Sequence, residues 1–100
     1  MVIEVISDGR SMPAEARTYA EYRVFSTLVR YTRLIERVHV RLRSARGRDG
    51  ADMVTCVVDV SLAHSGHVHS RSRGSNAYKA VDDAAKSVGD LMNRRSMPRL

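Results

Sequence analysis

The sequence has a single cysteine, two prolines, one phenylalanine and no long apolar run in its 100 residues. The lone Cys56 cannot form an internal disulfide, so the chain falls outside the class of small disulfide-stabilised secreted domains. No window of about 20 residues is apolar enough to span a bilayer. The N-terminus MVIEVISDGR carries acids where a signal peptide carries basic residues. We therefore expect a cytoplasmic protein.

The composition is typical of one globular domain. Hydrophobic residues make up 43% of the chain and charged residues 28%, with no low-complexity segment. A chain of this length can build one hydrophobic core of two packed layers, but not two independent cores. We predict a single domain over residues 1–96, followed by a short tail at 97–100.

Negative charge is scarce relative to positive charge. Seventeen Lys and Arg residues against eleven Asp and Glu residues give a formal net charge of +6 and a pI near 10.2, and fifteen of the seventeen are arginine. A guanidinium offers forked donors to phosphate, and binding releases condensed counterions. The balance favours a polyanionic partner, although a solubility role explains composition alone equally well.

Hydrophobic periodicity predicts the element order β-α-β-β-β-α. The β-branched segment at 2–7 is a strand, and Pro13, with Ser11 as cap, begins a helix that continues to about Tyr31. Alternating segments at 35–46, 53–63 and 67–73 follow, before a second helix that starts after the turn at 74–76, with Ser75 or Asn76 as its cap. Two helices on one face of a four-stranded sheet, an α+β fold, is the economical arrangement.

Each predicted helix has a distinct inward and outward side. The inward residues of the first helix are Ala16, Ala20, Val24, Thr27, Leu28 and Tyr31, and those of the second are Ala77, Val81, Ala84, Val88 and Leu91. A stripe exposed to solvent is predicted at Tyr19, Arg23, Ser26 and Arg30. Lys79, Asp83, Lys86 and Asp90 lie opposite the inner side of the second helix. Gly89 interrupts it at a cost of about 1 kcal/mol relative to alanine.

The predicted strands after the first helix alternate between apolar and polar sides. The inward residues are Val38, Val40, Leu42, Val54, Cys56, Val58, Val60 and Leu62. The outward residues of the first of these strands are Arg37, His39, Arg41 and Arg43, and those of the last are His67, His69, Arg71 and Arg73. The last strand is polar enough to suit a sheet edge.

Histidines cluster around the start of that last strand, at His64, His67 and His69. Two histidines two residues apart share a strand face and could both bind zinc or copper. A third ligand has no predicted position nearby, because Cys56 points inward. We predict no metal site and no cofactor, since a His-Arg face suits phosphate better than a cation. Zinc binding through His67 and His69 is a minor alternative.

No set of residues suits catalysis. Asp82 and Asp83 are neighbours on a helix and project about 100° apart, so they cannot face one substrate together. Asp82 is expected to pair with Lys79 or Lys86 on the helix surface. Cys56 lies in a valine-rich strand, which predicts a buried and unreactive thiol. The sequence has no phosphate-binding glycine loop. We predict a protein that is not an enzyme, has no catalytic residues and takes no small-molecule substrate.

Among RNA-binding modules, backbone-directed binding fits best. The GxxG at 47–50 matches a KH domain by chance, because it lies between predicted strands instead of between helices. An RRM needs aromatic residues on its central strands, whereas the aromatic residues here lie in predicted helices. Arginines would therefore contact the shape and charge of folded RNA, with Tyr19 or Tyr22 available for stacking.

Several short motifs resemble one family in their order and spacing. They are Gly9 and Arg10 after the first strand, Tyr19 followed four residues later by Arg23, the segment IERVHVRL, and AYKAVDDAAK at 77–86. Together they resemble the short form of the ribosome hibernation-promoting factor family. These ribosome-associated translation inhibitors are also called the sigma-54 modulation protein family. Its members share the β-α-β-β-β-α order and resemble double-stranded-RNA-binding domains in shape.

The resemblance implies a non-enzymatic translation inhibitor. Such a protein binds small-subunit rRNA across the tRNA and mRNA positions and keeps idle ribosomes from initiating. The RNA-binding residues carried over are Arg10, Arg23, Lys79 and Lys86, with Arg30, Arg94 and Arg95 as charge equivalents placed by helical face. The chain departs from the family at 87–90, where Ser-Val-Gly-Asp dilutes the positive charge of the last helix. Longer relatives pair ribosomes through a further domain, so pairing by this chain is expected to need another factor.

An alternative hypothesis is that the protein is a protein-protein interaction module of the same fold. Tyr22, Phe25 and Val29 form an apolar stripe on the outer side of the first helix. This stripe would mediate self-association as a homodimer or docking to a protein partner. We expect no membrane partner. The salt dependence of binding distinguishes the two hypotheses, because added salt weakens phosphate contacts steeply and leaves an apolar interface largely unchanged.

Overall fold

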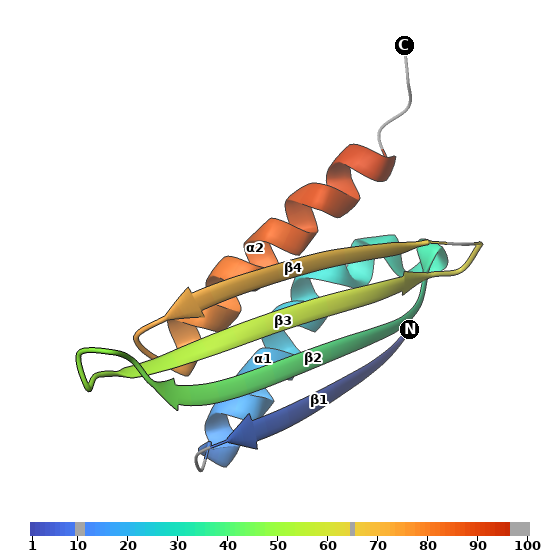
Figure 1. Ribbon diagram of the computed structural model, residues 1–100. Coiled ribbons are helices and arrows are strands. Elements are labelled where there is room, and N and C mark those ends of the chain that lie inside the picture. Colours follow the sequence, from blue (N-terminus) through green and yellow to red (C-terminus); the bar gives the residue numbers. More distant parts are fainter. Residues whose placement is uncertain (10–11, 65, 97–100) are drawn as a thin grey trace.

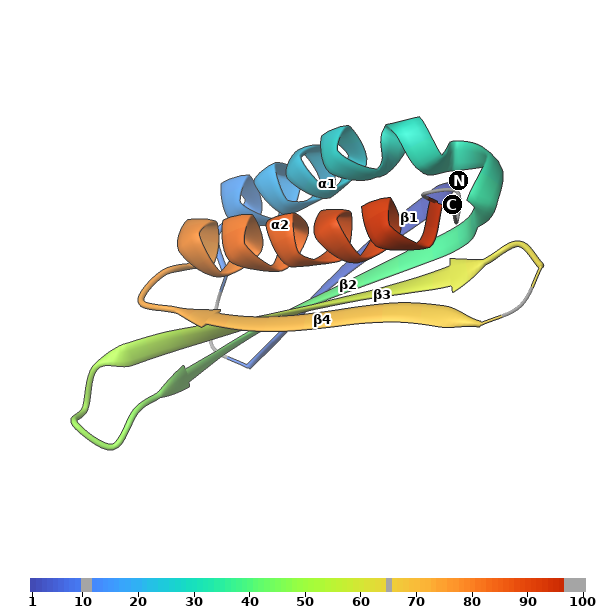
Figure 2. The ribbon, with the colours of Figure 1, turned by 90° about the horizontal axis from the view of Figure 1, so that it is seen from above.

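Four strands form one sheet in the order β1-β2-β3-β4, and two helices pack on one of its faces (Figures 1 and 2). The computed structural model describes residues 1–9, 12–64 and 66–96. Its elements are β1 (Val2–Gly9), α1 (Ala14–Leu28), the 3-10 helix η1 (Val29–Leu34), β2 (Ile35–Arg46), β3 (Asp52–Leu62), β4 (His67–Gly74) and α2 (Ala77–Ser96). The predicted α+β fold and its β-α-β-β-β-α order are confirmed, with η1 as an addition.

The sheet is mixed, and its register determines which outward side chains are neighbours. β1 and β2 are parallel, which requires a crossover connection, and α1 with η1 supplies it. β2, β3 and β4 follow one another as antiparallel hairpins. β4 is therefore a sheet edge, as predicted, and β1 is the other edge.

The core lies between the inner face of the sheet and the two helices. The fully buried residues of β2 and β3 are Val38, Val40, Leu42, Cys56, Val58 and Val60, as the alternation predicts. α1 buries Ala16, Ala20, Val24 and Leu28. Three of the inward predictions are only partly right. Thr27, Leu62 and Leu91 are half-buried, and Met92 is the fully buried residue at the end of α2.

The polar edge strand β4 is attached to α2 by a buried hydrogen bond. Ser70 points inward and is 5% exposed. Its Oγ donates to the Ala84 carbonyl oxygen at 2.9 Å, which satisfies the only polar side chain among the buried residues of the described chain. A strand with little apolar surface is thus held by backbone pairing to β3 and by this contact.

The helix ends differ in part from the sequence prediction. Pro13 is the N-cap of α1 instead of its first helical residue, and the predicted cap Ser11 lies outside the described residues. At the start of α2, the Asn76 Oδ1 accepts a hydrogen bond from the Lys79 amide at 2.9 Å, so Asn76 is the cap of the two predicted candidates. α1 ends at Leu28, and Tyr31 at φ −106° and ψ 17° departs from helical geometry inside η1. Among the described residues, no helix combines the length and apolar character that crossing a bilayer requires.

Cys56 is a structural thiol whose reactivity we expect to be low. Its side chain is fully buried, and burial raises the pKa of the thiol to about 12. At pH 8 the native protein should therefore react with a disulfide reagent about 10³-fold more slowly than the urea-unfolded chain. Timed labelling with and without urea measures the ratio. Similar rates in the two conditions would show that the thiol is open to solvent in the native state.

Candidate nucleic-acid interface

The basic residues predicted to bind RNA come from α1, η1 and α2. We call the described ones the helix surface; they are Arg23, Arg30, Lys79, Lys86, Arg94 and Arg95. The seventh predicted residue, Arg10, lies outside the described residues. Arg30 is exposed on η1, with its guanidinium carbon 5.4 Å from the centroid of the Tyr31 ring. This contact orients the guanidinium while leaving its donors free for a partner.

Both lysines of α2 are exposed and paired within the helix. Lys79 Nζ lies 3.6 Å from Asp83 Oδ2, and Lys86 Nζ lies 3.1 Å from Asp90 Oδ2. Each pair joins residues four apart, which confirms that these four side chains share the outer side of α2. Such exposed pairs are weak, so a phosphate can compete with the carboxylate for the ammonium group.

Arg94 and Arg95 are exposed in the last turn of α2. Cations at this end are favoured by the helix dipole, which supports an ordered final turn. Arg95 also borders a hollow with Leu34, Leu62, His64 and Met92, between the end of α2 and the β3–β4 end of the sheet. The positive charge of α2 therefore extends to its C-terminal end despite the uncharged positions 87–89.

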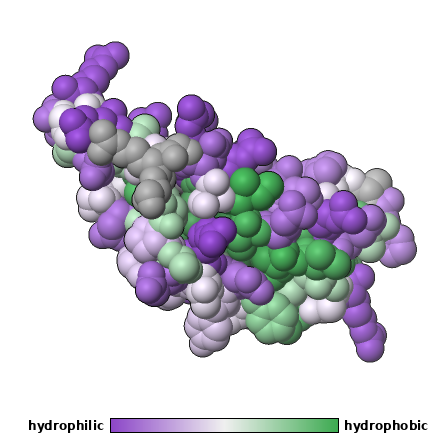
Figure 3. Space-filling model, turned by 90° about the horizontal axis from the view of Figure 1, so that it is seen from below, coloured by the Kyte–Doolittle hydropathy of each residue, from purple (hydrophilic) through white to green (hydrophobic). Residues whose placement is uncertain are grey.

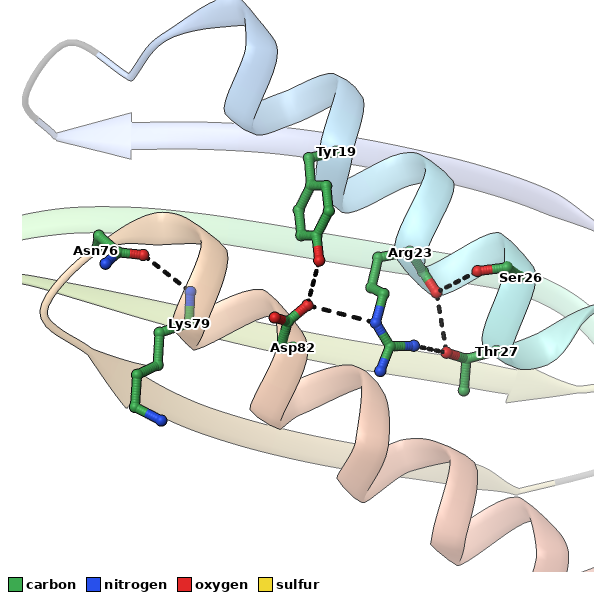
Figure 4. A network of polar contacts seen from close by, with 7 residues as sticks. All are labelled: Tyr19, Arg23, Ser26, Thr27, Asn76, Lys79 and Asp82. Carbon is green, nitrogen blue, oxygen red and sulfur yellow. Dashed lines mark hydrogen bonds and ion pairs between the residues drawn. The ribbon is translucent and has the colours of Figure 1, made fainter.

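Asp82 connects α2 to α1 instead of pairing on its own helix. Its Oδ1 accepts a hydrogen bond from Tyr19 Oη at 2.5 Å and lies 3.3 Å from Arg23 Nε (Figure 4). The expected pairing of Asp82 with Lys79 or Lys86 is wrong, because Asp82 projects toward α1 while Asp83 projects outward. The expectation that Asp82 and Asp83 do not converge on one substrate agrees with this geometry.

Tyr19 and Arg23 are also less open than the predicted solvent stripe. Tyr19 is half-buried, and its ring meets that of Tyr78 edge-on at 5.0 Å. The hydrogen bond to Asp82 raises the pKa of the Tyr19 hydroxyl, and desolvation adds to the rise. The Arg23 guanidinium further donates to Thr27 Oγ1 at 2.5 Å. Tyr19 is therefore a link between helices, whereas Tyr22 is 67% exposed and open to stacking.

This network predicts a difference between two neighbouring carboxylates. Asp82→Ala should lower the free energy of unfolding by about 1 kcal/mol, because Tyr19 and Arg23 both lose their partner at a half-exposed site. Asp83→Ala removes only an exposed pair within one helix and should cost less than about 0.5 kcal/mol. Urea unfolding of both variants measures the difference. Equal losses would contradict a cross-helix role for Asp82.

The outer face of the sheet carries further basic residues that the predicted site set omits. All eight outward residues of β2 and β4 identified from the alternation are exposed, as predicted. The alternation in the sequence predicts that these side chains point outward. Only the strand register shows that Arg41 and Arg71 flank Val57, and that Arg43 and Arg73 flank Thr55. Exposed Arg17 on α1 and Arg33 on η1 were likewise outside the predicted set.

The histidines do not assemble with other ligands. His67 Nδ1 lies 3.7 Å from Asp59 Oδ1 on the neighbouring strand, and His64 is exposed near the end of β3. Across the described part of the chain, no group of three or more His, Cys, Asp or Glu side chains is close enough to hold a metal ion. The geometry offers His67 and Asp59 as a polar pair at the sheet edge.

The sequence and the fold both match known proteins. Residues 3–96 match the profile of the family described as Sigma 54 modulation protein / S30EA ribosomal protein. The chain belongs to this family. No curated protein matches the sequence significantly. The recognised resemblance is thereby confirmed, and it extends over the whole described fold.

Two solved structures share the architecture of this family member. A ribosomal subunit interface protein from Coxiella burnetii superposes with a TM-score of 0.79 at 14% identity, covering 95% of this chain and 97% of the other. The Protein Y N-terminal domain from Thermus thermophilus superposes with a TM-score of 0.72 at 21% identity, covering 95% and 99%. At these identities the likeness establishes the fold. Family membership makes the chain a ribosome-associated factor concerned with translation.

Proposed function

We propose that this protein is a non-enzymatic translation inhibitor that binds small-subunit rRNA near the tRNA and mRNA positions. It would act by occupying those positions and so keep idle ribosomes from initiating. The observation that carries the proposal is the family match over residues 3–96, which spans every element that bears the helix surface. The exposed arginines and lysines supply donors to RNA phosphates.

The seven proposed contact residues do not contribute equally. We expect the largest contributions from exposed residues that form only weak ion pairs, or none within the described part of the chain: Arg30, Lys79, Lys86, Arg94 and Arg95. Arg23 is engaged by Asp82 and Thr27, and we expect its contribution to be smaller. Arg10 belongs to the proposed set through the family motif alone.

The remaining features are compatible with a binding protein. Cys56 is buried with a raised pKa, and the Asp82 and Asp83 carboxylates turn to different partners, so neither pattern supplies a nucleophile or an acid-base pair. We propose that residues 1–96 form the ribosome-binding domain and 97–100 a tail. A ribosome-bound factor of this kind would work in the cytoplasm.

Sedimentation with purified ribosomal particles tests the proposal. The protein should pellet with small subunits and whole ribosomes and much less with large subunits, at low and moderate salt. Binding should weaken steeply as salt rises, because phosphate contacts release counterions. A folded protein that remains in the supernatant with every particle would overturn the proposed function.

A hydrophobic groove beside β1 favours protein-protein interaction as a second candidate function. Tyr22 and Phe25 of α1 are 67% and 47% exposed. They line the groove together with Ile3 of β1 and Met1, which precedes that strand. Figure 3 shows hydrophobic surface gathered on this side of the molecule. Self-association that persists at high salt, measured by sedimentation over a range of concentrations, would support this role.

A further inference from the structure

The outer face of the sheet is the one that neither helix covers (Figures 1 and 2). Its outward residues from Arg37 to Arg43 on β2 and from His67 to Arg73 on β4 are exposed and basic. Toward the β2–β3 hairpin these residues are arginines only, Arg41 and Arg43 on β2 and Arg71 and Arg73 on β4. We call these four residues the arginine quartet.

The sheet register arranges the quartet as a rectangle. Arg41 is in register with Val57 and Val57 with Arg71, while Arg43 is in register with Thr55 and Thr55 with Arg73. Residues two apart on a strand are about 7 Å apart, and strands one removed are about 9.5 Å apart. The spacing along each strand is comparable to that of successive phosphates on a nucleic-acid strand. Four long side chains thus project from one rigid platform.

The charge of the quartet is not neutralised within the described parts of the chain. None of the four forms an ion pair with residues 1–9, 12–64 or 66–96. Two acids of the same face lie away from the quartet, with Glu4 on β1 beside His39 and Asp59 on β3 at 3.7 Å from His67. A third acid, Asp8 on β1, is in register with Arg43, but the two side chains form no ion pair. The quartet therefore presents an unneutralised positive field to solvent.

The shape and chemistry of this face suit the backbone of RNA. The described tyrosines and the phenylalanine all lie on α1, η1 and α2, and the histidines of the outer face lie toward the other end of the strands, so the quartet itself has no ring for base stacking. Arginine forks match phosphate oxygens in pairs, which gives binding without sequence preference. At the hairpin end, Arg48 and Arg73 border a hollow with Met53 and Thr55, which extends the basic surface beyond the strands.

We infer that the arginine quartet is a second RNA-phosphate-binding surface, on the side of the molecule opposite to α1 and α2. This inference rests on the proposed function for the identity of the polyanion, and it adds a separate contact surface to it. Two surfaces on opposite faces would let one small domain lie between two RNA segments. The quartet would then add affinity independently of the helix surface.

Replacing the quartet with glutamine tests the inference. The Arg41→Gln, Arg43→Gln, Arg71→Gln, Arg73→Gln variant should bind small subunits on the order of 10²-fold more weakly at moderate salt. The slope of log K against log salt should fall by about 3 units, because each lost phosphate contact removes about 0.7 to 0.9. A matched variant with Arg17, Arg33, Arg37 and Arg46 changed to glutamine loses the same charge outside the quartet. Its affinity for small subunits should fall much less.

The outcomes distinguish this inference from the proposed function. If wild-type protein fails to bind small subunits, the proposed function fails first. The inference is wrong if the quartet variant binds small subunits as tightly as the wild type does. It is also wrong if both quadruple variants lose affinity equally. An equal loss of binding to RNA and to poly-glutamate would also overturn it, in favour of an acidic polypeptide partner. Unchanged thermal unfolding of both variants shows that binding alone was altered.

Discussion

Changing Arg30, Lys79 and Lys86 together to glutamine is expected to weaken small-subunit binding by about 10- to 100-fold at moderate salt. The three cations are exposed, and each would contact phosphate. Their loss should reduce the salt slope by about 2 to 3 units. Stability should fall by at most about 2 kcal/mol, because the change removes two exposed pairs with Asp83 and Asp90 and the contact of Arg30 with the Tyr31 ring. Fluorescence binding titrations at several salt concentrations measure both quantities.

A variant with the same charge change is the control for this prediction. Arg17, Arg33 and Arg46 are also exposed but belong to neither proposed surface. Their triple change to glutamine alters the net charge equally and should reduce affinity by only a few-fold through the general field. If this control loses as much affinity as the helix-surface variant, binding follows net charge and the residue assignment is wrong.

Gly89→Ala is expected to destabilise the protein, although alanine is the better helix former. A Cβ at position 89 would lie 2.7 Å from Thr27 Cγ2, where α2 passes close to α1. Thr27 cannot easily turn away, because its Oγ1 donates to the Arg23 carbonyl oxygen at 2.9 Å and its χ1 is restricted. Overpacking of about 1–3 kcal/mol should exceed the propensity gain of about 1 kcal/mol, for a net loss of up to about 2 kcal/mol.

Thr27→Ser provides the matched rescue for Gly89→Ala. Serine keeps the hydroxyl and its hydrogen bonds but lacks the Cγ2 methyl that the new Cβ would meet. The double variant should therefore recover most of the stability lost by Gly89→Ala, and a double-mutant cycle in urea measures the coupling. A single Gly89→Ala variant more stable than wild type would show that the helices do not meet closely at this glycine.

Features that repeat along the chain were predictable from the sequence, because they depend on local periodicity. The alternation in residues 35–46 and 53–63 determined the buried sides of β2 and β3, and Asn76 was identifiable as a cap. The exposed placement of Lys79 and Lys86 followed from helical spacing in the same way. These predictions need only the geometry of one element, so tertiary packing changed them little.

Features that depend on how two elements meet were not predictable. Tyr19 and Arg23 were expected in solvent, but Asp82 of α2 lies beside them because the two helices pack side by side on the sheet. The quartet likewise required the register of three strands, which the alternation within each strand does not specify. Gly89 had the appearance of a weak point in a helix, and its role as a close-approach position appears only against Thr27.

Chemical probing of small-subunit rRNA with and without the bound protein tests the central claim most directly. The proposed function predicts protections that cluster at the tRNA and mRNA positions of the decoding region, and that weaken in the Arg30, Lys79 and Lys86 variant. Binding tRNA or mRNA should compete with the same protections. Protections confined to rRNA away from these positions, unaffected by tRNA or mRNA, would contradict inhibition by occlusion.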